Sequence, residues 1–216
     1  KSSMIGKLLY LYESQEKKAG RKELKNVFYL GDLCSGGEAN RHLFERMQEY
    51  IDTNYESRYL KAVYISGDGG AWIKAGAEYI EKGVPVLDKF HMMKYINKAA
   101  NQMLDEAGEA KGRLWKALYK GKKKKFVKTI KAIRKCAPNE KAVNDWDSAV
   151  RRMRDKNVYG CSAEGHVSHM YSDRMSSRPM GWSEAGADAM CQLRCYVKDY
   201  GEEKILELVK YRRNHK

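Results

Sequence analysis

The sequence predicts a layered α/β fold that carries an all-helical insertion. Strand-like and helix-like segments alternate from residue 61 to residue 88, which is typical of parallel strands joined by crossover helices. Residues 89–156 show helical periodicity and no strand pattern. The 216 residues, 43% of them apolar, are sufficient to bury a core.

The α/β part is expected to begin with an antiparallel pair of strands and to continue with a parallel pair. These strands are expected at residues 7–14, 25–32, 61–67 and 84–88. A polar hairpin connection joins the first two, and helices are expected at 37–55 and 71–82. The strand at 61–67 has little polar alternation, so we expect it to be buried on both sides.

Four apolar stripes in the insertion and two closing segments predict further helices. The stripes lie within residues 96–104, 114–118, 126–133 and 143–153. The closing helices are expected to bury one face each, formed by Met190, Leu193, Val197 and Tyr200 in the first and by Ile205, Leu206 and Val209 in the second. The expected divisions of the chain are 1–91, 92–156 and 157–216.

Cys191 and Cys195 lie at helical spacing on the first closing helix, without a second pair elsewhere. A zinc site needs more ligands than these two supply, so we expect both thiols in the core. The odd total of five cysteines fits a reducing compartment and free thiols better than a disulfide framework.

The charge balance narrows the class of partner. Forty-two Lys and Arg oppose 28 Asp and Glu, and a net charge of +14 indicates a polyanion such as nucleic acid, although a merely soluble surface also tolerates positive charge. Residues 120–135 are very basic, which is compatible with a solvated helix face or with phosphate contact. No apolar run is long enough to span a membrane, so we expect a cytoplasmic protein with no membrane partner.

The segment "YISGDGGAWIK" (64–74) places Asp68 directly after a strand. Asp-Gly is most often a turn, but a helix follows here, so a hairpin does not fit. Ligand sites in open α/β sheets gather at the carboxyl ends of strands, and Asp88 ends the next strand. Converging carboxylates favour Mg²⁺, which supports phosphodiester cleavage.

Glu164, within "GCSAEGHVSHM", is the candidate for a further acid from a distant part of the chain. It could share a helix with His166 and His169. The alternative is a surface or helix N-terminal carboxylate, which the surrounding His, Arg and Ser residues make less favourable. Arg174 and Arg178 are suited to bidentate phosphate binding, while Arg178 before Pro179 could also be an ordinary loop residue.

His91 follows Asp88 by three positions and forms a D-x-x-H sequence. A structural histidine is the commoner outcome for a single residue of this kind. Zinc held by Asp88, His91, His166 and His169 is a weaker alternative, because no compact spacing motif supports it.

Three blocks carry a family resemblance. "YISGDGGAWIK", "VLDKFHMMKYI" and "GCSAEGHVSHMYSDRMSSRPMGWS" together resemble the ISLre-type family of bacterial insertion-sequence transposases, over most of residues 8–195. The resemblance implies a DDE transposase with a ribonuclease-H-like mixed sheet, flanking helices and a Mutator-like helical insertion. It further implies cleavage and strand transfer at transposon ends, on DNA of the bacterial nucleoid, with possible homo-oligomers by analogy.

The resemblance also assigns roles to residues. Asp68 and Glu164 match the second and last catalytic acids and would hold Mg²⁺ (or Mn²⁺), while Asp88 and His91 would organise the site. The expected DNA-binding residues are His166, His169, Arg174 and Arg178.

The matched segments start at the second strand of that fold, so the first strand and the first catalytic Asp are expected before Lys1. Asp32 follows a strand but matches the third one by position. We therefore expect the chain alone to be inactive. Two alternatives stay open, a ribonuclease-H-like nuclease without strand transfer and a non-catalytic, transposase-derived DNA-binding protein.

Overall fold

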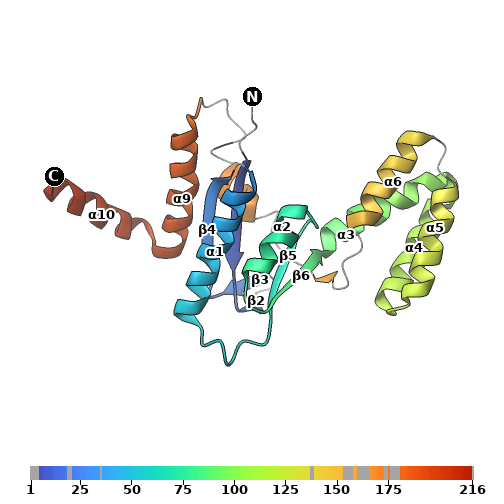
Figure 1. Ribbon diagram of the computed structural model, residues 1–216, viewed down its shortest axis with the longest axis horizontal. Helices are drawn as coiled ribbons and strands as arrows, with labels where there is room; N and C mark the ends of the chain where they lie inside the picture. The colour runs from blue at the N-terminus through green and yellow to red at the C-terminus, as the bar shows by residue number, and fades with distance from the viewer. Residues whose placement is uncertain are drawn as a thin grey trace. The chain divides into compact units, whose positions relative to one another are not determined.

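The structure is a computed structural model with two compact units. It describes residues 5–18, 21–34, 36–136, 139–152, 158–159, 166–172, 175 and 181–215 (Figure 1). Unit 1 comprises Lys1–Leu60, Tyr79–Glu81 and Ser162–Lys216, and unit 2 comprises Lys61–Glu78 and Lys82–Cys161. The structure is mixed α/β, as the sequence predicts, while the expected divisions 1–91, 92–156 and 157–216 stay a prediction.

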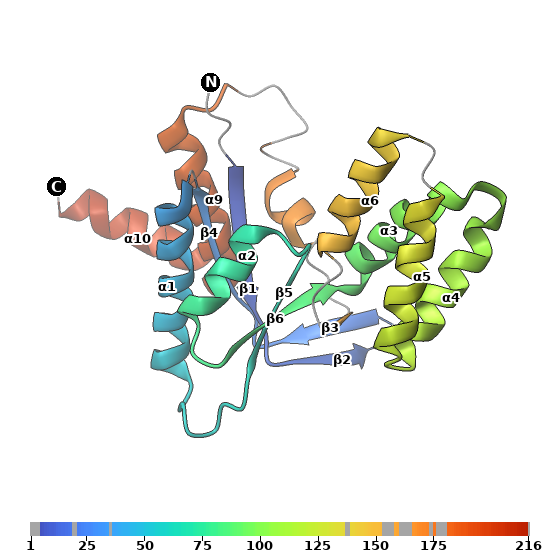
Figure 2. The same cartoon turned by 45° about the vertical axis from the view of Figure 1, so that its right-hand side comes forward.

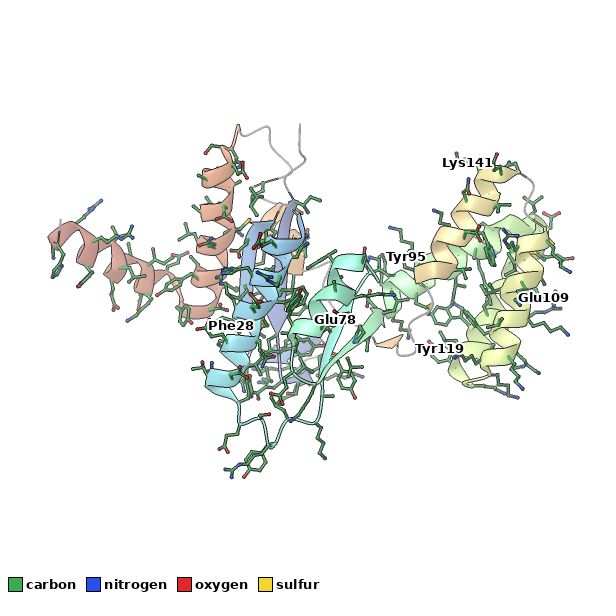
Figure 3. The ribbon with its side chains drawn as sticks, viewed as in Figure 1. Phe28, Glu78, Tyr95, Glu109, Tyr119 and Lys141 are labelled. Atoms are coloured by element: carbon green, nitrogen blue, oxygen red, sulfur yellow. The ribbon has the colours of Figure 1, made fainter. Side chains whose placement is uncertain are left out.

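Unit 1 is built on an antiparallel pair, β1 (Ile5–Leu11) and β4 (Phe28–Cys34), in the register Leu8↔Gly31. The polar connection between them forms a hairpin of its own, β2 (Ser14–Lys18) with β3 (Arg21–Lys25). Helix α1 (Gly36–Asn54) follows as expected, and the ring of Phe28 stacks on Tyr50 of this helix with ring centroids 3.5 Å apart (Figure 3).

Helix α9 (Glu184–Tyr200) runs along β4 and closes its outer edge (Figure 1). The backbone N–H of Tyr29 donates to Asp199 Oδ1 at 3.0 Å, and that of Leu33 donates to Asp188 Oδ1 at 2.8 Å. An uncovered strand edge invites pairing with other chains, and these two carboxylates occupy the donors that such pairing would use. Among the described residues, β1 has no strand neighbour on its other side.

Small residues form the face of α9 that packs against β4, so the buried face predicted from the sequence is wrong. Ala187, Cys191 and Cys195 are buried, which confirms the two thiols as core residues. Leu193 and Tyr200 are instead 43% and 55% exposed. Because α9 approaches β4 closely, only small side chains fit between them. The more apolar stripe of the helix is therefore not the one that packs.

Gly31 makes this close approach possible. A Cβ at Gly31 would overlap the Tyr171 hydroxyl and lie 2.9 Å from Cys195 Sγ. Tyr171 itself donates to the carbonyl of Lys7 at 3.0 Å, which ties it to β1. The last helix, α10 (Glu202–Asn214), buries none of its residues, so its expected buried face is also wrong.

Unit 2 contains the parallel strands. β5 (Val63–Gly67) pairs in parallel with β6 (Gly83–Asp88), and the crossover between them holds α2 (Ala71–Gly76) and a 3₁₀ turn at Ala77–Tyr79. β7 (Val158–Tyr159) adds a short parallel strand beside β6. The expected two-sided burial of β5 is wrong, since Tyr64 is 58% exposed. β5 has a strand neighbour on one side only among the described residues.

The four stripes of the insertion correspond to four helices, but the first stripe was predicted too long, since it continues past its helix to Leu104, which is 76% exposed. The four helices are α3 (Lys89–Ala100), α4 (Ala107–Tyr119), α5 (Lys123–Lys135) and α6 (Glu140–Arg152), with a 3₁₀ segment at Asn101–Glu106 between the first two. Met92, Ile96, Leu114, Ile133 and Trp146 form their shared core. Helices α4 and α5 lie side by side in both ribbon views (Figure 2).

Within the described part of the chain, no helix combines the length and the apolar character that crossing a bilayer requires.

We expect Gly31→Ala to destabilise the chain by about 1–3 kcal/mol, because the added methyl group overpacks the contact with Tyr171. Gly112→Ala is the control. An added Cβ there meets nothing within 4 Å, and it should stabilise α4 by about 1 kcal/mol. Urea unfolding measures both. Adding Tyr171→Phe to Gly31→Ala should recover part of the loss, and no recovery would contradict the steric explanation.

Candidate functional site

The pairing of β5 with β6 brings two carboxylates to one edge of the sheet. The register places Gly67 opposite Leu87, so the next residues, Asp68 and Asp88, leave the two strands at the same level. The strands run in the same direction, and their carboxyl ends therefore share an edge. The sequence predicted this neighbourhood.

Asp88 ends β6 and begins α3. Its Oδ2 accepts from the His91 backbone N–H at 3.3 Å and is paired with His91 Nδ1 at 3.1 Å. The residue is only 4% exposed. The D-x-x-H sequence is thus an N-cap in which the same oxygen also orients the imidazole. If Nδ1 donates to the carboxylate, the lone pair of the ring lies on Nε2.

Asp68 is held in an Asx turn. Its Oδ1 accepts from the Gly70 N–H at 2.7 Å, and its backbone carbonyl accepts from the hydroxyl of Tyr95 on α3 at 2.8 Å (Figure 3). Gly69 between them has a φ of +76°, which glycine adopts readily. The turn interpretation and the site interpretation therefore describe the same geometry, a partly buried carboxylate fixed at a strand end.

Ser66 is a polar residue that the sequence analysis missed. Its Oγ is buried and has no hydrogen-bond partner among the described residues. Ser66 lies near the end of β5, two residues before Asp68, which follows that strand. A hydroxyl within an apolar strand was the available signal.

His166 and Tyr29 form a packed pair in unit 1. Tyr29 Oη lies 2.8 Å from His166 Nδ1, and the imidazole stacks on Tyr10 with centroids 4.3 Å apart. Burial, and then the nearby Lys198 and His169, lowers the pKa of His166. These contacts favour a neutral structural histidine. His169 is exposed, and its carbonyl accepts from Arg194 Nη2 at 2.9 Å.

Three of the predicted residues, Glu164, Arg174 and Arg178, lie outside the described residues. The convergence of Asp68 with Glu164 accordingly stays a prediction. Among the residues that are described, no group of three or more His, Cys, Asp or Glu side chains is placed to hold a metal, so the zinc alternative gains no support.

We expect Asp88→Ala to lower the free energy of unfolding by about 1–2 kcal/mol, because α3 loses its N-cap. Asp88→Asn should lower it by only about 0.3 kcal/mol, since the amide oxygen still accepts the hydrogen bond from the helix. Urea unfolding of the two variants measures the difference. Equal losses would show that the carboxylate charge, and not the cap, stabilises this edge.

A second prediction concerns pH and Asp199. Burial raises the pKa of Asp199 from its ordinary 3.8 to about 6, against the lowering effect of the Tyr29 N–H bond. The folded state therefore binds this proton more tightly than the unfolded state. The stabilisation from this group is complete below about pH 4 and is lost as pH rises through 6.

Asp199→Asn keeps an acceptor for Tyr29 and removes this titration. We expect the variant to exceed the parent in unfolding free energy by about 1 kcal/mol at pH 7.5, a small value because solvent screens a half-exposed carboxylate. The difference should vanish near pH 4. Urea unfolding at several pH values tests this, and a difference that does not change with pH would contradict it.

Comparison with known proteins places the chain in a family. A model of the uncharacterised protein family UPF0236 matches residues 1–212. Two UPF0236 proteins of Caldanaerobacter subterraneus subsp. tengcongensis are 35% and 34% identical to it, over 95% and 93% of this chain and over 45% and 44% of their own length. The chain thus spans less than half of these curated relatives, and no solved structure matches it. The chain belongs to the UPF0236 family.

Proposed function

We propose that this chain is part of the catalytic region of a DDE-type DNA transposase with a ribonuclease-H-like fold. The observation that carries the proposal is the edge where Asp68 and Asp88 leave adjacent parallel strands, with the D-x-x-H cap at the start of α3. The same layout is what the sequence resemblance implies. The proposed protein acts on bacterial DNA in the cytoplasm, and we propose that it works as a homo-oligomer.

The open strand edges support the ribonuclease-H-like part of the proposal. β1 in unit 1 and β5 in unit 2 each have a strand neighbour on one side only among the described residues. The fold implied by the resemblance includes a further strand beside such an edge, and none of the described strands occupies that place. A strand supplied from another segment would satisfy such an edge.

The donor chemistry fits a hard divalent cation. Asp68 and Asp88 offer carboxylate oxygens, which Mg²⁺ and Mn²⁺ prefer. In the proposal Asp68 and Glu164 hold the ion, and Asp88 keeps His91 oriented beside them. Arg174 and Arg178 bind phosphate of the DNA. When bound, the ion would supply activation of a water or hydroxyl nucleophile and stabilisation of the leaving oxygen.

The names of the relatives add an independent argument. The name of one of them joins eleven numbered designations in a single organism, and the name of another joins four. Several designations for one protein are expected of a gene present in several copies. A mobile element that copies itself would leave such a pattern.

Two alternatives remain distinguishable from the proposal. A ribonuclease-H-like nuclease would cleave DNA but would not join pre-cleaved ends to a target. A non-catalytic DNA-binding protein would retain its function after loss of Asp68. The Asx turn gives the carboxylate of Asp68 a structural role, and this observation favours the non-catalytic DNA-binding protein.

In the full-length protein, we expect Asp68→Asn to reduce Mg²⁺-dependent cleavage of a transposon-end duplex by about a thousandfold or more, with DNA affinity within twofold of the parent. Asp105→Asn, at an exposed position of the same unit, is the matched control and should cleave normally. Asn still accepts a hydrogen bond, so the turn should persist. Unchanged cleavage by Asp68→Asn would refute the assignment.

A further inference from the structure

The positive charge of the chain is concentrated on one helical hairpin. Residues 120–135 hold nine Lys and Arg and no Asp or Glu. The other 200 residues hold 33 Lys and Arg against 28 Asp and Glu, which is close to balance. A charge that served solubility alone would be spread over the surface, so this concentration indicates a dedicated surface.

The hairpin formed by α4 and α5 encloses a groove of about 490 Å³. Its floor includes the small residues Ala110, Ala117 and Ala132, which leave it hollow. Six cations line it, three from α4 and its end and three from α5 and its start, namely Arg113, Lys116, Lys120, Lys122, Lys125 and Lys128. Glu109 and Tyr119 mark the two ends of α4 (Figure 3).

Acidic residues do not neutralise this groove. Glu109 is paired with Arg113 at 2.6 Å, and Glu106 lies near the same end. Within the described residues, the five groove lysines form no ion pair with a carboxylate. All five are exposed.

The position of the lysines carries a cost in helix stability. Lys123, Lys124 and Lys125 occupy the first turn of α5, where the helix dipole is positive, and Lys122 before them provides no side-chain cap. Like charges at a positive helix end are unfavourable. A bound anion would remove this repulsion.

We propose that the groove between α4 and α5, lined by Lys116, Lys120, Lys122, Lys125 and Lys128, binds the phosphate backbone of nucleic acid. Lys122 directly precedes α5, and Lys125 and Lys128 follow at three-residue intervals within the helix, a rise of about 4.5 Å between the last two. Such a row matches a linear array of phosphates better than a single small anion. Among the described residues that line the groove none is aromatic, so we expect contacts to phosphates without base stacking, and binding that does not depend on the base sequence.

An anionic membrane is the less suitable partner. A helix that binds a membrane surface inserts an apolar face, whereas α5 uses Ile130 and Ile133 in the core of unit 2. Of the exposed residues of α5, Val127 is apolar, and the lysines outnumber it. The proposed groove needs neither the metal nor the catalytic acids, so it stands independently of the proposed transposase activity.

The test measures binding of the full chain to a random-sequence 40-base-pair duplex. Fluorescence anisotropy reports the binding, in EDTA and across a range of salt concentrations. The groove variant is Lys122→Gln/Lys125→Gln/Lys128→Gln. The control is Lys61→Gln/Lys94→Gln/Lys141→Gln, which removes the same charge from exposed positions of the same unit that do not line the groove. EDTA separates this experiment from cleavage.

We expect the groove variant to bind at least tenfold more weakly at 0.1 M salt and to lose about 2–3 from the slope of log K against log salt, because each phosphate contact contributes about 0.9. The control should change affinity by less than about threefold. Thermal unfolding at low salt should show the groove variant folded and no less stable than the parent.

Equal weakening by both triple variants would overturn the proposal, because it would show a nonspecific effect of net charge. So would unchanged DNA affinity of the groove variant, including the case in which that variant instead loses binding to vesicles of phosphatidylserine and phosphatidylcholine. Restoration of DNA affinity by Lys122→Arg/Lys125→Arg/Lys128→Arg would support the proposal.

Discussion

Asp88 is the residue on which the architecture of unit 2 depends. It is the last residue of β6 and the cap of α3, so one buried carboxylate ends the sheet and starts the helical region. It is paired with His91, and the pair lies beside the turn that holds Asp68. A buried carboxylate is costly unless its charge is compensated. The N–H groups of the helix start provide compensation, and this requirement fixes where α3 begins and which way its first turn faces.

The same logic organises unit 1, where carboxylates again meet backbone N–H groups. Asp188 and Asp199 on α9 accept from β4, and in doing so they hold the helix close enough for Cys191 and Cys195 to pack. This contact demands a glycine at position 31 and small side chains opposite. The polar contacts set the distance between helix and strand, and the small residues fill it.

Sequence patterns predicted the elements better than their contacts. The strands, their parallel order and the four helices of the insertion follow from periodicity, and Asp68 and Asp88 meet at one edge because both end a strand. The packed face of α9 could not be predicted in this way, since a stripe of Met, Leu, Val and Tyr is more apolar than one of Ala and Cys. The space that Gly31 of β4 leaves determines which face of α9 packs, and β4 is far from α9 in the sequence. The contact of His166 with Tyr29 could not be predicted either, because the two residues are 137 positions apart in the sequence, and the DNA-binding role of His166 stays a prediction.

A site that gathers carboxylates has to obtain substrate affinity from elsewhere. Asp68 and Asp88 repel a polyanion at short range, and the repulsion is strongest where the site is least hydrated. The lysines of the α4–α5 hairpin lie in the same unit. The end of α4 lies close to the start of α3, because the ammonium group of Lys89, the residue after Asp88, is 5.7 Å from the ring centroid of Tyr119, and Lys120 follows Tyr119. Under the two proposals, the groove lysines would therefore offset the repulsion between the carboxylates of the strand ends and a DNA backbone that lies beside them.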